Sequence, residues 1–107
     1  MDWQTIGNYA VMCDSDTFRI YPKGKDGQTR PVTISRLLLN LRHIPSGEAF
    51  FFNRHLHQGK WKWIDSRCGS VTESHVLSEV SRLLFGGNTE RGGDVLRAFV
   101  LGKPLAA

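Results

Sequence analysis

The sequence predicts an α+β domain: a small antiparallel sheet of two hairpins, covered on one face by two or three helices, in the order β-β-(α)-β-β-α-α. Three observations predict it: apolar and polar residues alternate around turn residues in the first two thirds, apolar residues repeat at helical spacing in the last third, and 107 residues suit one domain over 1–107. An apolar fraction of 40% and a charged fraction of 22% exclude a disordered chain or a disulfide scaffold.

The first hairpin is expected from residues 9–13 and 18–21, joined by a turn at Ser15 and Asp16. Asp and Ser favour turns because their short side chains hydrogen-bond the nearby backbone. With this turn, the two-residue period of strands places five side chains on one apolar face: Tyr9, Val11, Cys13, Phe18 and Ile20.

Two connecting segments follow the first hairpin. Residues 22–31 contain two prolines, two glycines and three cations, which predicts a basic, flexible loop. Residues 32–44 space their apolar side chains as a helix does, with Thr33 or Ser35 as N-cap and Pro45 as a stop, so a helix is favoured over a strand there.

The second hairpin is the most informative segment. Residues 48–57 and 60–64 are rich in aromatic residues and meet at Gln58-Gly59, which predicts two strands and a two-residue turn. This register pairs His57 with Lys60 and Arg54 with Trp63. One face then carries Phe52, Arg54, Leu56, Trp61 and Trp63, with the Arg54 guanidinium able to lie over an indole ring, and the other is wholly polar and basic: Asn53, His55, His57, Lys60 and Lys62.

The C-terminal third predicts two helices. Ser70 and Glu73 have the spacing of a capping box, and the apolar stripe that follows ends at Gly86-Gly87. Asp94 is expected to cap a second, shorter helix that stops at Gly102, with residues 102–107 as a frayed tail.

Positive charge is concentrated in the middle of the chain. Residues 19–67 hold ten Lys or Arg against three Asp or Glu, whereas residues 68–107 are neutral overall and residues 1–18 carry three Asp and no Lys or Arg. Such a basic segment attracts polyanions and also suits an ordinary solvated face. The residues predicted to bind nucleic acid or an acidic partner are Lys23, Lys25, Arg30, Asn53, Arg54, His55, His57, Lys60, Lys62 and Arg67.

Two non-catalytic functions fit this pattern. The first is a basic module that binds nucleic acid through the second hairpin and the 22–31 loop, by phosphate neutralisation and base stacking. The alternative is a protein-interaction module of phage or mobile-element type that inhibits or adapts a larger host complex, by docking its basic face on an acidic surface. A homodimer is also compatible with so short a chain.

Catalytic and metal sites are disfavoured. Cys68 just before a helix could pair with a distant His as a nucleophile, but no known signature surrounds it. His55 and His57 could chelate a metal with Cys13, Cys68, His43 or His75, yet Lys60 and Lys62 would repel it. No cofactor is therefore expected. The lack of a signal peptide or long apolar run predicts a cytoplasmic protein with free thiols and no membrane partner.

Overall fold

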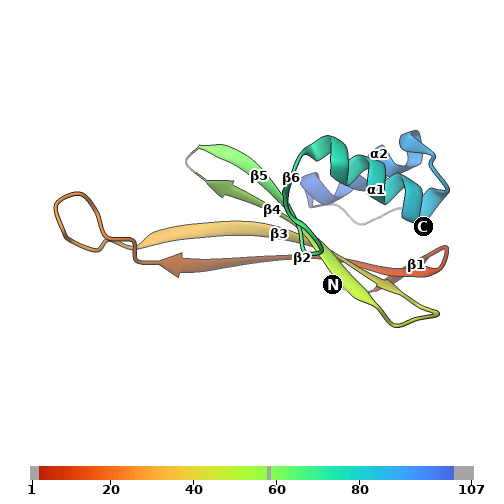
Figure 1. Cartoon of the computed structure of the whole chain (residues 1–107), viewed down its shortest axis with the longest axis horizontal. Coiled ribbons are helices and arrows are strands. Elements are labelled where there is room, and N and C mark those ends of the chain that lie inside the picture. The colour runs from red at the N-terminus through yellow and green to blue at the C-terminus, as the bar shows by residue number, and fades with distance from the viewer. Residues whose placement is uncertain (1–2, 58, 103–107) are drawn as a thin grey trace.

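The computed structural model describes residues 3–57 and 59–102, which form one six-stranded antiparallel sheet and two helices (Figure 1). The α+β class is therefore confirmed. The strands lie in the sheet in chain order, so each pairs with its neighbour in sequence. The elements are β1 (Gln4–Ile6), β2 (Tyr9–Ile20), β3 (Val32–His43), β4 (Ala49–His57), β5 (Lys60–Asp65), β6 (Gly69–Val71), α1 (Glu73–Phe85) and α2 (Thr89–Leu101).

The core lies between one face of the sheet, here called the inner face, and the two helices (Figure 1). Alternate residues of the central strands supply its sheet side, and Leu39 and Phe52 are fully buried there as cross-strand partners. The helices contribute the other side, where the Phe99 ring lies 6.0 Å from that of Trp63. The buried apolar core residues are Ile6, Val11, Cys13, Leu39, Leu41, Phe52, Trp63, Val76, Val80, Leu84, Val95, Leu96 and Phe99.

The predicted turn at Ser15 and Asp16 is wrong, because β2 continues without a break through both residues. Its partner β3 pairs with it along the whole length, and two hydrogen bonds of 2.6 and 2.8 Å from Arg36 to Asp16 tie the strands at this point. Cross-strand pairing therefore outweighs the local turn preference. Phe18 consequently lies on the opposite face from Cys13, not beside it.

The predicted helix over residues 32–44 is also wrong, because Val32–His43 is strand β3. The run of three leucines at 37–39 fits either period, so helical spacing there did not decide the structure. In the sheet, Leu39 and Leu41 are buried on the inner face, while Leu38 lies on the outer face, which neither helix covers.

Beyond the helices, β2 and β3 extend as a two-stranded arm, residues 14–37, which projects from the body (Figure 1). The molecule accordingly measures 52 × 25 × 24 Å. The segment at residues 22–31 is the loop at the arm's tip, as expected. Backbone hydrogen bonds from Gly24 to Gln28 and from Gly27 to Gly24, together with an Arg30–Asp26 ion pair of 2.6 Å, order this loop.

The second hairpin is confirmed in its register. His57 pairs with Lys60, Leu56 with Trp61, and Arg54 with Trp63. Gln58, the first residue of the predicted turn, lies outside the described residues, and Gly59 has a φ of 76°, a left-handed conformation that glycine adopts without strain. The inner and outer faces of β4 and β5 are therefore those the sequence predicts.

The two helices begin at residues other than those expected. The N-cap of α1 is Thr72, whose hydroxyl accepts a hydrogen bond of 3.1 Å from the His75 backbone, and Ser70 belongs to β6. The N-cap of α2 is Asn88, six residues before Asp94, so this helix is a full turn and a half longer than predicted. Gly86 and Gly102 end the helices as expected, and residues 103–107 of the predicted tail lie outside the described residues.

Ser81 of α1 packs closely against Gly92 of α2, because a Cβ at position 92 would lie 3.0 Å or less from three Ser81 atoms. Ser81 is buried, and its hydroxyl donates a hydrogen bond of 2.6 Å to the carbonyl of Leu77. Among the described residues, no helix is long and apolar enough to cross a membrane, and Cys13 and Cys68 are both free thiols.

Candidate functional site

Trp61 stands exposed at the end of the β4–β5 hairpin. The register turns both Trp61 and Trp63 to the inner face, but only Trp63 is covered, with 6% of its surface exposed against 49% for Trp61. The Arg54 guanidinium lies over the Trp61 ring, 3.8 Å from its centroid, and 5.7 Å from that of Trp63. The expected contact between the Arg54 cation and an indole ring is thus present. The guanidinium covers one face of Trp61, whose side chain the sequence had predicted to be buried in the core.

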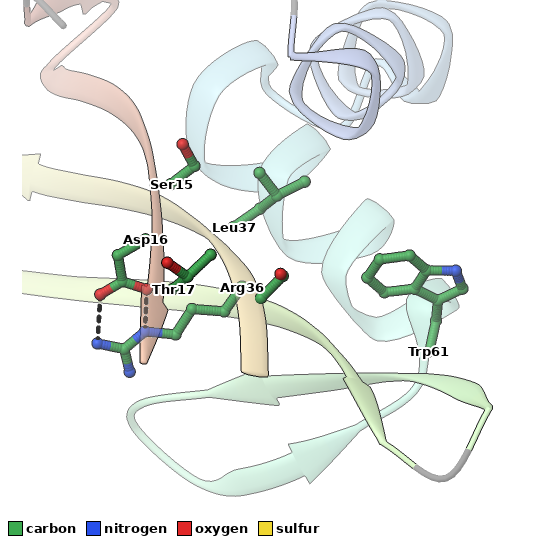
Figure 2. A pocket seen from close by; sticks show the side chains of 7 residues that line it. Ser15, Asp16, Thr17, Arg36, Leu37 and Trp61 are labelled. Atoms are coloured by element: carbon green, nitrogen blue, oxygen red, sulfur yellow. Dashed lines mark hydrogen bonds and ion pairs between the residues drawn. The ribbon is translucent and has the colours of Figure 1, made fainter. Parts of the chain in front are cut away.

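Two hollows flank Trp61. The first, of about 390 Å³, lies between Trp61 and the base of the arm, where Leu37 is an apolar lining residue (Figure 2). Its rim is polar and includes the hydroxyls of Ser15, Thr17 and Ser35 and the Asp16–Arg36 ion pair. The second, of about 560 Å³, lies on the side of β6 and is lined by Arg54, Trp61, Lys62, Trp63, Ser70, Val71, Thr72 and Glu73.

The end of this hairpin is basic. No acidic residue occurs from position 49 to position 64, and Lys60 and Lys62 are both exposed. Lys62 also lines the second hollow, together with Trp61. Burial lowers the pKa of the Arg54 guanidinium, and the nearby Glu73 carboxylate acts against this shift. An arginine remains charged even so, and it contributes a cation beneath the indole.

The outer face is less basic than the sequence suggests. Asn53 is only 8% exposed, because Leu38 and Ile64 are its cross-strand neighbours, so its amide is not available to a large ligand. His55 is half-buried, and the side chain of His57 lies outside the described part of the chain. The predicted basic face therefore reduces, among the described side chains, to Lys60 and Lys62.

The remaining predicted binding residues lie elsewhere. Lys23, Lys25 and Arg30 are grouped at the arm tip, and the last of them is paired with Asp26. The structure thus separates the loop cations from those of the hairpin. The Arg67 guanidinium donates hydrogen bonds to Asp65 and Glu79 and lies 4.1 Å from the Phe50 ring centroid. These contacts within the protein leave it poorly available to a ligand.

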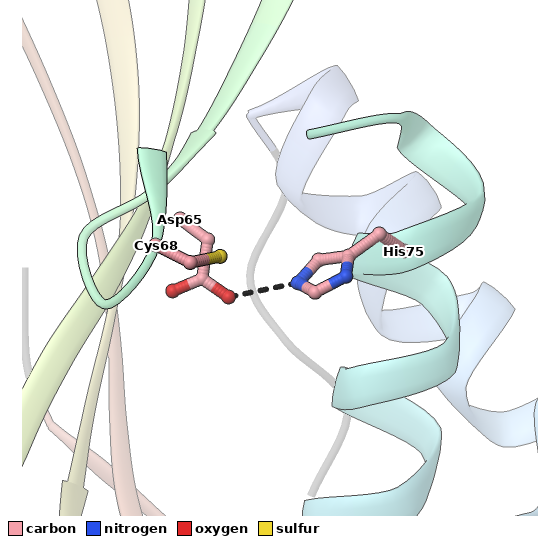
Figure 3. A group of neighbouring side chains, drawn as sticks. All are labelled: Asp65, Cys68 and His75. Atoms are coloured by element: carbon pink, nitrogen blue, oxygen red, sulfur yellow. Dashed lines mark hydrogen bonds and ion pairs between the residues drawn. The ribbon is translucent and has the colours of Figure 1, made fainter. Parts of the chain in front are cut away.

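Asp65 is the centre of a buried polar cluster between the sheet and α1 (Figure 3). It accepts hydrogen bonds from the backbone and the guanidinium of Arg67, and its Oδ2 lies 2.8 Å from His75 Nε2. Burial acts to raise the pKa of this carboxyl, but the hydrogen bonds from Arg67 and His75 outweigh it and hold the pKa well below its usual range. The cluster links β5 to the first turn of α1.

Cys68 completes a group of potential metal ligands with Asp65 and His75, whose ligand atoms lie within 4.8 Å of one another. A soft divalent cation could bind all three, but it would have to displace Arg67 from the carboxylate. As a nucleophile Cys68 is poorly placed, because desolvation and the Asp65 charge both raise its pKa and disfavour the reactive thiolate. The arrangement serves as a structural junction.

Sequence reasoning missed the hydroxyl rim of the first hollow. These three residues, Ser15, Thr17 and Ser35, belong to the arm. Their side chains are seen to lie on the same face as Leu37 only when β2 and β3 are recognised as one long hairpin. The signal was present in the alternation of residues 14–20, which the Asp-Ser-Asp turn propensity obscured. It also missed the Asp65 cluster, whose members are three and seven residues apart in sequence.

In the comparisons with known proteins, the chain matches no protein-family model, no curated protein and no solved structure.

Proposed function

We propose that the protein is a non-catalytic module that binds single-stranded nucleic acid through the end of the β4–β5 hairpin. In this proposal one unpaired base stacks on Trp61 while Lys60 and Lys62 neutralise neighbouring phosphates. The observation that carries it is the exposed Trp61 ring, backed by Arg54 and set between two hollows at the end of a hairpin that has no acidic residue from position 49 to position 64.

Stacking requires a rigid aromatic ring with one accessible face. The Arg54 guanidinium at 3.8 Å occupies one face of the Trp61 indole and holds its orientation, which leaves the other face for a planar ligand. Every base has such a planar face, and a stacked base contributes about 1–3 kcal/mol with little dependence on sequence. The hydroxyls of Ser15, Thr17 and Ser35 offer donors and acceptors to the edge of a base held beside Trp61 in the first hollow.

The phosphate contribution is electrostatic. Lys60 and Lys62 lie in the part of β5 that precedes its pairing with β6, so this edge is open among the described residues. A strand that passes the edge can place a base on the inner side and phosphates beside both ammonium groups. Each phosphate neutralised releases counterions, with a slope of about −0.7 in log K against log salt for a single strand.

The test is a titration of a fluorescently labelled single-stranded oligonucleotide at low and moderate salt. Trp61→Ala should weaken binding by about 5- to 150-fold, the equivalent of one lost stack. Trp3→Ala is the matched control, because Trp3 is similarly exposed at 45% and also stacks with an arginine, Arg42, but lies on β1's side of the sheet. Lys62→Ala should lower the salt slope by about 0.7.

Absence of binding at low salt would refute the proposal, as would equal losses in the Trp61 and Trp3 variants. The second candidate function is docking on an acidic protein surface. The contact of Trp61 with Arg54 favours it, because exposed Trp and Arg side chains frequently anchor protein interfaces. A nuclease-treated pull-down that recovers one stoichiometric protein, lost with Trp61→Ala, would favour this alternative.

A further inference from the structure

The arm is amphipathic, and its apolar side is exposed apart from the Arg36 guanidinium, which lies 5.1 Å from the centroid of the Phe18 ring. Phe18 and Ile34 are cross-strand partners on the outer face, and Ile20 and Val32 form the next such pair toward the tip. Phe18, Ile20 and Val32 are 41%, 41% and 42% exposed. The other side of the same ribbon carries polar residues: Thr17, Arg19, Thr33 and Ser35.

A two-stranded ribbon with an exposed apolar side is marginally stable in water, so a partner that covers it would stabilise the arm. The amount of exposed surface supports this view. The chain exposes 7020 Å², whereas a compact monomer of its mass exposes about 6,000 Å². The surplus of about 1,000 Å² is close to the ~800 Å² that each partner buries in an interface of standard size.

The charges along the arm identify the partner. Asp14, which forms no ion pair among the described residues, lies on the outer face where the arm leaves the body, beside Asp16, whose carboxylate is paired with Arg36. The tip loop carries Lys23 and Lys25, likewise without ion pairs among the described residues. Along the arm, one unpaired carboxylate at the base is thus followed by apolar residues and then by two unpaired cations at the tip.

This order is self-complementary about a two-fold axis through the apolar part. Asp14 stands five positions before residue 19, and Lys23 and Lys25 stand four and six positions after it. At about 3.3 Å per residue, Asp14 lies ~16 Å from residue 19 along β2, and Lys23 and Lys25 lie past the end of that strand, in the tip loop. Two antiparallel arms would therefore bring the tip of each over the acidic base of the other, as an isologous interface requires.

We propose that the occupant of this surface is a second copy of the chain, docked arm on arm in antiparallel orientation. The apolar residues of the two copies pack against each other, and Lys23 and Lys25 of one copy face Asp14 of the other. The inference is independent of the nucleic-acid proposal. Trp61 and the hydroxyls of Ser15 and Thr17 lie on the inner side of the sheet and remain accessible in such a dimer.

Sedimentation velocity on the full, nuclease-treated chain tests this over a wide concentration range. The expected species has twice the 12.1 kDa mass of the chain. Phe18→Lys should raise the dimer dissociation constant at least tenfold, whereas Thr17→Lys, which adds the same charge on the adjacent residue of the opposite side, should leave it within about twofold. Both sites lie outside the core, and circular dichroism and thermal melting confirm that each variant is folded.

A charge exchange provides the second part of the test. Asp14→Lys should weaken the dimer, because like charges then face each other across the interface, and adding Lys23→Asp and Lys25→Asp should restore it. A wild-type chain that sediments as a monomer at every concentration overturns the proposal. So do equal effects of Phe18→Lys and Thr17→Lys, a charge exchange without rescue, or association that requires an oligonucleotide or another protein.

Discussion

The close packing of α1 on α2 at Ser81 predicts opposite outcomes for two adjacent glycines. Gly92 and Gly93 both lie inside α2, and each would gain helix propensity from replacement by alanine. A Cβ at position 92 would lie 2.0 Å from Ser81 Oγ, 2.9 Å from its Cβ and 3.0 Å from its Cα. At position 93 the nearest atom is Leu77 Cδ1 at 3.9 Å, an ordinary van der Waals distance.

The magnitudes follow from these distances. Rotation of the Ser81 hydroxyl would remove the shortest contact but would break its 2.6 Å hydrogen bond to Leu77, and the contacts to Cβ and Cα would persist. The helices must therefore separate, and overpacking of this kind costs about 1–3 kcal/mol. Gly93→Ala meets no such obstacle and should stabilise the protein by about 0.5–1 kcal/mol through helix propensity.

Urea unfolding monitored by circular dichroism measures both free energies of unfolding, and thermal melting provides a second readout. For a domain of about this size, 1 kcal/mol corresponds to roughly 4–8 °C in Tm. Gly92→Ala should therefore melt below the wild type and Gly93→Ala slightly above it. If Gly92→Ala proved as stable as Gly93→Ala, the close packing of α1 on α2 at Ser81 would be disproved.

Three further predictions concern the junction of the sheet with α1. Asp65→Asn should lower the free energy of unfolding by about 2–3 kcal/mol at neutral pH, since it removes hydrogen bonds to a buried charge. Because the pKa of Asp65 is depressed in the folded state, this stabilisation exists above about pH 4 and is lost as the pH falls below it. In urea unfolding the difference from wild type should therefore shrink in acid, and a difference that stayed constant would contradict the assignment. Iodoacetamide should modify Cys13 only after unfolding, because burial raises the pKa of its thiol to about 11. It should modify Cys68 faster in the Asp65→Asn variant than in the wild type, because the Asp65 charge raises the Cys68 pKa. Mass spectrometry measures both, and unchanged Cys68 reactivity would contradict the prediction. Thr72→Ala should destabilise the protein by about 1 kcal/mol through loss of the N-cap, whereas Ser70→Ala should change it by less than about 0.5 kcal/mol; the reverse order in denaturant titrations would favour the capping box instead.

The sequence predicted best where pattern and turn residues agreed. In the β4–β5 hairpin, alternation, aromatic content and the glycine turn all pointed to one register, and that register is the observed one. The ends of the helices at Gly86 and Gly102 were equally well determined, because a left-handed C-cap favours glycine.

Errors arose where a local preference competed with pairing to a distant strand. Ser15 and Asp16 have turn propensity, but β3 offers a partner to every residue of β2, and the Asp16–Arg36 ion pair fixes an extended conformation. Residues 37–39 are leucines and satisfy a helix or a strand equally, so only their neighbours in the sheet decide between them.

The candidate site was half predictable for a related reason. The sequence placed Trp61 and Trp63 on the same face correctly, yet it could not show that the helices reach only Trp63. Exposure depends on where α1 and α2 end over the sheet, which is a property of packing between distant segments. The contact of Arg54 with the indole ring followed from the register alone.

The chain-order arrangement of the six strands has a consequence for how the molecule forms. Each new strand can add to the edge left by the one before it, so the sheet can grow by short loop closures from either end of the chain, a topology associated with rapid folding. The helices follow all six strands in the chain, however, and until they are synthesised Val11, Leu39 and Phe52 lack the helices that cover them in the folded protein. On the ribosome, the nascent sheet therefore exposes its apolar inner face until residue 101 emerges. An exposed apolar face favours aggregation during this interval.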